Sequence, residues 1–166
     1  MNIILNKLAL KFENLWLKLR KRAMIQRLTQ YPNIHDKAVL SPDVQLIGSF
    51  ENFIIGQGSY INDAILVTGK KAQIRIGRNC AIGYRVSLKA LTHDVNNPCP
   101  NIKGEIKTIE RDINIGDSCW IGDNVFIREG VVIGDNVVIG ANSVVTKSFG
   151  NNTVIAGVPA TIIAHK

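Results

Sequence analysis

Residues 113–147 read INIGDSCWIGDNVFIREGVVIGDNVVIGANSVVTK, and this stretch decides the fold. In it an aliphatic side chain returns at every sixth position without a break. The period of six does not match the 3.6 residues of an α-helical turn. It is typical of short strands joined by tight turns, in which each strand places one aliphatic side chain inward. The series consists of Ile115, Ile121, Ile127, Ile133, Ile139 and Val145.

Three such strands make a triangular coil of 18 residues, and coils stack at about 4.8 Å, the spacing of paired strands. Small or β-branched side chains predominate four residues after each aliphatic, where they are expected to fill the core between coils. The turns carry Asp and Asn, which tolerate positive φ or cap their own turns. The small-position series is Cys119, Val125, Val131, Val137, Ser143 and Phe149, and the turn residues are Asp117, Asp123, Asn124, Asp135, Asn136 and Asn142.

The same phase extends toward the N-terminus, through Ile76, Ile82 and Leu88 and a weaker block at 55–67. The repeat domain is therefore predicted over residues 38–164. Residues 67–75 interrupt it briefly, and residues 92–112 form a longer excursion loop. A loop that leaves a rigid scaffold is a common place for functional residues.

Residues 3–30 predict one amphipathic helix within an N-terminal segment of residues 1–31. Leu8, Leu15 and Leu19 recur at helical spacing, and Phe12 and Trp16 widen the apolar stripe. Residues 1–30 hold seven Lys and Arg but one acid, whereas residues 31–166 hold 13 bases and 12 acids. Two interpretations stay open: the helix packs on its own body or on a sister subunit, or it lies on an anionic membrane surface.

The composition excludes several classes of protein. The chain has 166 residues and a formal net charge of +7, but that charge sits in the N-terminal segment, so nucleic acid is not an expected partner. Three cysteines make an odd count and favour a reducing compartment. The apolar start lacks the features of a signal peptide or a spanning helix. We therefore expect a cytoplasmic protein, either free or peripheral on the inner face of the cytoplasmic membrane.

The run from Trp120 to Lys147, followed by IAGVPA at 155–160, resembles the hexapeptide-repeat acetyltransferases. It is most similar to the galactoside and maltose O-acetyltransferase branch and its relatives that acetylate surface polysaccharides. The resemblance implies an all-β, left-handed parallel β-helix, although the general crossover rule favours the right hand. It also implies a homotrimer that transfers acetyl groups from acetyl-CoA. The acceptor implied is a sugar or glycan hydroxyl, in capsule, O-antigen or exopolysaccharide biosynthesis.

His93 is the candidate general base, because acetyl transfer to a hydroxyl requires removal of its proton and an imidazole titrates near neutral pH. In the resembling family a loop histidine of this kind has that role. Without the family, a solvated loop histidine would be the simpler interpretation. The histidines His35, His93 and His165 are too far apart in sequence to suggest a zinc site, and Cys80 and Cys119 occupy core positions, so no metal is expected.

The resemblance further implies that Trp120, Gly122, Ala141, Thr146 and Lys147 bind acetyl-CoA. Small residues let the pantetheine arm approach the backbone, and a lysine suits phosphates. A backbone N–H near Gly122 and Asp123 could hold the thioester oxygen. Trp120 could equally shield the coil, and Lys147 could be a solvated turn residue. In the family arrangement, His93 and Lys147 of one site come from different subunits.

Asn62 and Asp63 align loosely with an acceptor-binding region and could equally form an ordinary turn. The predicted reaction is direct acetyl transfer without an acyl-enzyme. Three alternatives remain: an N-acetyltransferase acting on a nucleotide-linked amino sugar, a serine acetyltransferase, and a non-catalytic β-helix scaffold.

Overall fold

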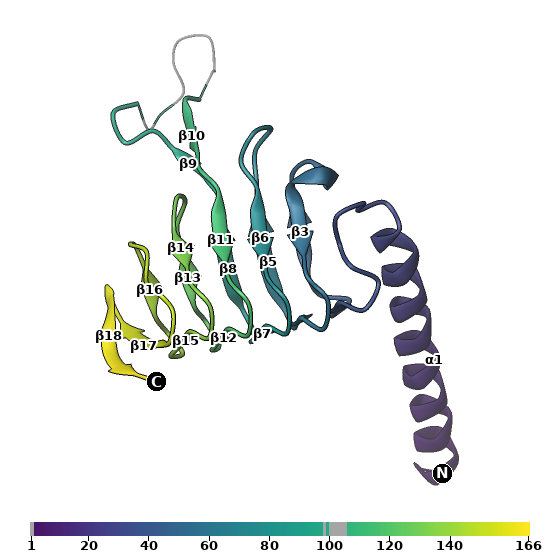
Figure 1. The fold of residues 1–166 in the computed structure, drawn as a ribbon. Coiled ribbons are helices and arrows are strands. Elements are labelled where there is room, and N and C mark those ends of the chain that lie inside the picture. Colours follow the sequence, from purple (N-terminus) through teal and green to yellow (C-terminus); the bar gives the residue numbers. More distant parts are fainter. Residues whose placement is uncertain (1, 98, 100–105) are drawn as a thin grey trace.

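The computed structural model describes residues 2–97, 99 and 106–166, and its body is a triangular parallel β-helix (Figure 1). As far as β16, the strands of the body visit three sheets in rotation, which we name A, B and C. Sheet A contains β3 (Phe53–Ile55), β6 (Ile74–Ile76), β11 (Ile113–Ile115) and β14 (Val132–Ile133). Sheet B contains β1 (Val39–Leu40), β4 (Tyr60–Ile61), β7 (Ala81–Ile82), β12 (Trp120–Ile121), β15 (Val138–Ile139), β17 (Thr153–Gly157) and β18 (Ala160–His165). Sheet C contains β2 (Gln45–Ile47), β5 (Ala64–Val67), β8 (Val86–Lys89), β13 (Phe126–Ile127) and β16 (Val144–Val145).

The register confirms the predicted coil. Trp120 pairs with Val138, which lies three hexapeptides further along the chain, so one turn of the β-helix takes three repeats. Ala81 pairs with Trp120, and their separation in sequence is more than twice that of Trp120 and Val138. The additional length forms the excursion at 92–112, which rises from the body as a two-stranded ribbon of β9 (Leu91–His93) and β10 (Thr108–Glu110) (Figure 1).

The core lies inside the triangle and is built by the predicted series. The aliphatic positions stack from coil to coil, and the side chains of that series from Ile121 to Val145 are at most 1% exposed. Cys80, Cys119 and Ser143 are buried at the small position, as their place in the repeat predicts. Because each coil buries its aliphatic side chains against its two neighbours, stability is a sum of nearest-neighbour contacts.

The turns confirm the expected positive φ of asparagine but not the expected capping by aspartate. Asn124, Asn136 and Asn142 have φ of 57°, 55° and 59°, the left-handed conformation that Asn tolerates. The aspartates do not cap their own turns. Asp117 and Asp135 accept hydrogen bonds from backbone N–H groups of the preceding coil, at 2.7 Å in each case. The side chains therefore join coils, which a single turn considered alone does not reveal.

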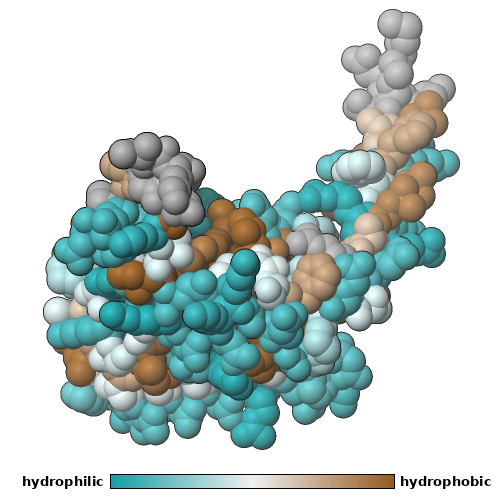
Figure 2. Space-filling model, turned by 90° about the horizontal axis from the view of Figure 1, so that it is seen from above, coloured by the Kyte–Doolittle hydropathy of each residue, from teal (hydrophilic) through white to brown (hydrophobic). Residues whose placement is uncertain are grey.

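Helix α1 (Asn2–Leu28) projects from the body (Figure 1), and its described part carries exposed apolar side chains (Figure 2). At the other end of the molecule, β18 turns back antiparallel to β17 and covers the last coil. The short helix η1 (Phe50–Asn52) lies between β2 and β3. The observed elements are thus an all-β body with one N-terminal helix, as predicted.

Candidate active site

Two edges of the triangular body carry the predicted site residues other than Trp120. We name CA edge the turns from sheet C to sheet A, at residues 68–73, 90–112, 128–131 and 146–148. We name BC edge the turns from sheet B to sheet C, at residues 62–63, 83–85, 122–124 and 140–143. The edge on which a predicted site residue lies is set by the sheet of the strand that precedes it.

The ribbon on the CA edge carries His93 at the end of β9. His93 pairs with Thr108 of β10, and the pairing continues to Glu110 at the base of the ribbon. The backbone N–H of Asp94 donates to the carbonyl of Lys107 at 2.9 Å, so the two chains stay together beyond the strands. The His93 side chain is exposed in the single chain. The tip at 98 and 100–105 lies outside the described residues.

Glu110 fixes the base of the ribbon on one side. One oxygen of its carboxylate accepts hydrogen bonds from the backbone N–H groups of Lys71, at 2.7 Å, and Ala72, at 3.0 Å. These bonds, with Ala72 contributing most, lower the pKa of Glu110 below its usual value. A carboxylate held in this way is ionised at neutral pH, and it ties the ribbon to the turn that precedes β6.

Glu129 flanks the base of the ribbon on the other side. Its side chain is buried and pairs with the guanidinium of Arg128. Burial alone would raise the pKa of Glu129, but the hydrogen bond from Arg128 and the charges of Arg128 and Arg111 outweigh it, so the pKa is lowered. Arg111, the first residue after β10, runs across Gly130, where an added Cβ would lie 3.1 Å from its Cδ. The sequence prediction missed these residues, although the pair Arg128–Glu129 breaks the repeat where glycine is usual.

Thr146 and Lys147 also lie on the CA edge, directly after β16. Both are exposed, and the Nζ of Lys147 is 5.7 Å from the ring centroid of Phe149. His93 and Lys147 therefore share one edge of one chain. Their assignment to different subunits of one site stays a prediction.

The BC edge holds four other predicted residues: Asn62, Asp63, Gly122 and Ala141. The amide of Asn62 donates to the carbonyl of Ile82 in the next coil at 3.1 Å, which gives it a role in stacking. A Cβ added to Gly122 would lie 2.7 Å from the backbone nitrogen of Ala141. Close stacking therefore requires glycine at this position, independently of any ligand.

The sequence leaves one backbone N–H group on the BC edge without a side-chain acceptor. The N–H of Gly122 is used, since it donates to the carbonyl of Ile139 at 2.8 Å. The next backbone N–H along the chain is that of Asp123. By analogy with the edge between sheets A and B, this group would point at the side chain of residue 141 in the next coil. At that A–B edge, Asp135 accepts from the N–H of Asp117. Because residue 141 is alanine, no side-chain acceptor stands at this place, and within the described chain the Asp123 N–H is the better candidate donor for a thioester oxygen.

Trp120 lies in β12 of sheet B, and its side chain is 59% exposed. Figure 1 places β12 on the side of the body opposite to the ribbon of β9 and β10. One chain therefore brings His93 and Lys147 to one edge, and Trp120, Gly122 and Ala141 to the other side.

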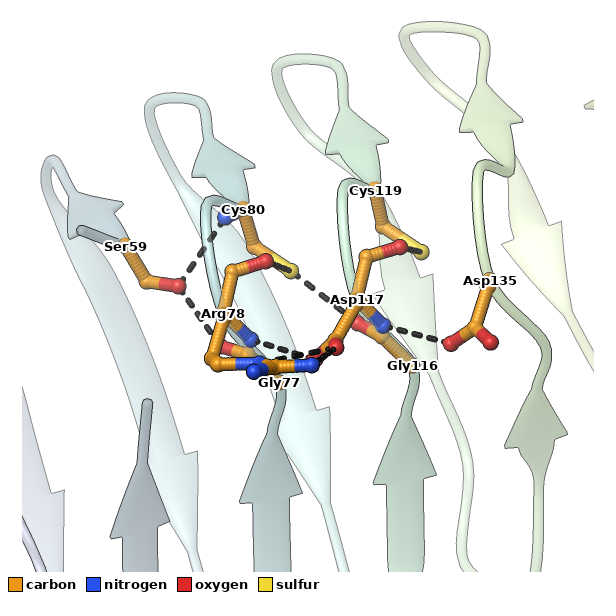
Figure 3. Close-up of polar contacts among 8 residues, drawn as sticks. All are labelled: Ser59, Gly77, Arg78, Cys80, Gly116, Asp117, Cys119 and Asp135. Atoms are coloured by element: carbon orange, nitrogen blue, oxygen red, sulfur yellow. Dashed lines mark hydrogen bonds and ion pairs between the residues drawn. The ribbon is translucent and has the colours of Figure 1, made fainter. Parts of the chain in front are cut away.

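The edge between sheets A and B carries a charged ladder (Figure 3). Arg78 binds a carboxylate oxygen of Asp117 through Nε, at 2.9 Å, and through a terminal nitrogen, at 2.6 Å. The hydrogen bond from Arg78 is the main cause that lowers the pKa of Asp117. The ladder continues to Asp135, which joins the next coil. These residues link coils and are not part of the predicted site.

Two buried thiols lie beside this ladder (Figure 3). Cys80 donates to the carbonyl of Gly116, which Figure 3 shows, and Cys119 donates to the carbonyl of Gly134, at 3.1 Å in each case. The Cys80 thiol and burial raise the pKa of Cys119, which therefore stays protonated. The described residues contain no group of three His, Cys, Asp or Glu side chains that could hold a metal ion.

A groove of about 640 Å³ runs along the outer face of sheet A, with His35 at one end. Its lining includes Ile54, Arg75, Asn114 and Val132, and it contains none of the predicted site residues. This groove is thus separate from both edges that carry the predicted chemistry.

Comparison with known proteins agrees with the geometry. Residues 112–147 match the family described as bacterial transferase hexapeptide (six repeats). A protein of Dictyostelium discoideum named "Putative acetyltransferase" is 33% identical over 153 residues, which are 92% of this chain and 77% of that protein.

Two solved structures extend the likeness to three dimensions. A maltose O-acetyltransferase from Clostridium difficile superposes with a TM-score of 0.72 at 27% identity, over 90% of this chain and 84% of that one. A hexapeptide-repeat acetyltransferase from Vibrio cholerae, complexed with acetyl-CoA, gives a TM-score of 0.67 at 26% identity, over 92% and 88%. The fold is the left-handed parallel β-helix that these proteins share.

Proposed function

Because this chain belongs to the hexapeptide-repeat transferases and is an acetyltransferase that uses acetyl-CoA, we propose that it acetylates a sugar hydroxyl with His93 as the general base. The observation that carries the proposal is the ribbon of β9 and β10. The chain interrupts a regular solenoid at this ribbon and places an imidazole on the inserted element. It then fixes the base of that element with Glu110. A scaffold would have no need of this arrangement.

The proposed reaction is a direct transfer. The imidazole of His93 takes the proton of the acceptor hydroxyl, and the oxygen forms a bond to the thioester carbon. The carbon–sulfur bond then breaks, and the thiolate of coenzyme A leaves and takes up a proton. In this reaction the N–H of Asp123 stabilises the oxyanion of the intermediate, and Lys147 supplies a cation for the phosphates. Holding both substrates in position contributes much of the acceleration.

We propose a homotrimer in which each site combines the ribbon of one copy, which carries His93, with the sheet-B side of its neighbour, which carries Trp120. The support is the separation of β9 from β12 within one chain. Co-expression of His93→Ala with Trp120→Ala tests this, because mixed trimers would contain some sites with both native side chains. Activity above that of either variant alone is expected. Activity no higher than the two variants give separately would place the whole site in one copy.

A surface-polysaccharide precursor is the acceptor we propose, met at the inner face of the cytoplasmic membrane. The name of the maltose O-acetyltransferase supports a sugar hydroxyl, and the basic helix at residues 1–30 supports a membrane setting. No described helix is long and apolar enough to cross a membrane. An amino group on a nucleotide-linked sugar is the second candidate, because the same base and thioester would serve it.

The experiment that tests the proposal is the release of coenzyme A thiol from acetyl-CoA in the presence of sugars, amino sugars and serine. Release that needs both a sugar hydroxyl and His93 would support it. Release with an amino sugar alone would favour the second candidate, and release with serine alone would contradict both.

A further inference from the structure

Helix α1 presents a surface that the rest of the chain does not cover. Among its described side chains, the contacts with the body lie between Arg20 and Leu28: Met24 is buried, Leu28 is partly buried, and Arg20 pairs with Asp43. Every side chain at residues 7–19 is exposed. Figure 1 shows the helix extending away from the β-helix, and Figure 2 shows apolar side chains on its described part.

Five of the exposed apolar side chains form a continuous stripe, whereas Leu10 and Leu17 lie on the other side of the helix. Leu8, Phe12, Leu15, Trp16 and Leu19 follow one another at spacings of four, three, one and three residues. With 100° of rotation per residue, these five fall on about a quarter to a third of the helix circumference. The exposed fractions are 70% for Phe12 and 62% for Trp16, so two large aromatic side chains are in water in the single chain.

Basic side chains run along one flank of this stripe. Lys7, Lys11, Lys18 and Arg22 project within about 60° of one another on the helix, next to Leu15 and Leu8. Long basic side chains can lie along an apolar surface while their charges stay at its polar boundary. An apolar stripe with aromatic side chains, flanked by bases, is the arrangement of helices that lie in the interface of a membrane.

Charge decides between a lipid surface and a second copy of the chain. Residues 1–30 contain seven bases and the single acid Glu13, so two such helices would repel each other. The rest of the chain, with 13 bases and 12 acids, is nearly neutral overall. Anionic headgroups are complementary to the helix, and each Lys or Arg near such a surface adds to the attraction.

We propose that helix α1 docks the enzyme on an anionic lipid surface, with the stripe from Leu8 to Leu19 among the acyl chains and the flanking bases at the headgroups. The helix lies in the plane of the membrane. Docking brings the acetyltransferase to an acceptor carried on lipid; this use of the surface rests on the proposed function, but docking itself does not.

The test is co-sedimentation of the full chain with phosphatidylcholine vesicles that contain or lack phosphatidylglycerol. We expect binding only to the anionic vesicles and weaker binding at high salt. The double variant Phe12→Glu/Trp16→Glu should lower the partition coefficient at least about tenfold, because two aromatic side chains no longer enter the acyl region.

A matched control is Leu10→Glu/Leu17→Glu. These leucines are 57% and 54% exposed, but they lie on the other side of the helix from the stripe. The control adds the same charge and should retain most of the binding. Equal losses in the two double variants would overturn the proposed stripe, as would a wild-type chain that does not bind anionic vesicles. Disruption of the oligomer by Phe12→Glu/Trp16→Glu in the absence of lipid would assign the stripe to a second copy instead.

Acetyl transfer to a soluble sugar separates docking from catalysis. The stripe variant should retain wild-type transfer in solution. A chain that binds anionic vesicles but transfers acetyl to no acceptor would contradict the proposed function and leave docking in place.

Discussion

Replacing Glu110 by alanine should release the ribbon that carries His93 without unfolding the solenoid. The carboxylate accepts two backbone N–H bonds, from Lys71 and Ala72. Hydrogen bonds to charged groups contribute roughly 1.5–3 kcal/mol each, and solvent screening at this partly exposed position reduces the pair to about 2 kcal/mol in total. A loss of that size shifts the equilibrium between attached and detached ribbon by about 30-fold.

Amide hydrogen exchange followed by mass spectrometry measures this shift directly. Peptides that contain 91–94 and 106–111 should exchange about 30-fold faster in Glu110→Ala, in the regime where exchange reports the opening equilibrium. The control is Asp112→Ala, because Asp112 accepts a similar bond from the N–H of Gln73 but lies beyond the ribbon, next to β11. Unchanged ribbon exchange in Glu110→Ala, or equal acceleration in both variants, would refute the reasoning.

Three further predictions concern the solenoid. Ile127→Ala removes a fully buried side chain, so the free energy of unfolding in a denaturant titration should fall by about 2–5 kcal/mol; a loss below about 1 kcal/mol would contradict coil-on-coil packing. Gly122→Ala should lower the melting temperature, because its Cβ would lie 2.7 Å from the backbone nitrogen of Ala141; an unchanged melting temperature would show that the coils can separate at no cost. The pKa of Asp117 is lowered by Arg78, so the pair should stabilise the fold above about pH 4 and lose that effect as the pH falls through the folded pKa; in Asp117→Asn this part of the acid dependence should vanish.

The period of six was sufficient to predict the body of the fold. Once Ile115, Ile121 and Ile127 are placed inward, the chain must close one coil with every three repeats, and Trp120 must then lie beside Val138. The physical reason is that one inward aliphatic per strand leaves a single way to bury all of them. The position of a residue in the repeat could also have assigned the site residues to the two edges, since Gly122 follows a sheet-B strand and Thr146 follows a sheet-C strand.

The ribbon could be predicted only as an interruption of the repeat. His93 pairs with Thr108 in an antiparallel ribbon, which the six-residue repeat does not predict. The hydrogen bond from the N–H of Lys71 to Glu110 joins two distant parts of the sequence. The same limit applies to the aspartates of the turns. Asp117 could be placed in a turn from sequence, but its partner is the N–H of Arg78 in another coil.

The central claim is tested most directly by sugar-dependent release of coenzyme A thiol, measured for the wild-type chain beside His93→Ala. We predict release with a sugar hydroxyl for the wild type and its loss in His93→Ala, with the melting temperature and the oligomer unchanged. Undiminished release by a folded His93→Ala chain would contradict the assignment of His93 as the general base. The absence of both release and acetyl-CoA binding in the wild type would contradict the proposed function itself.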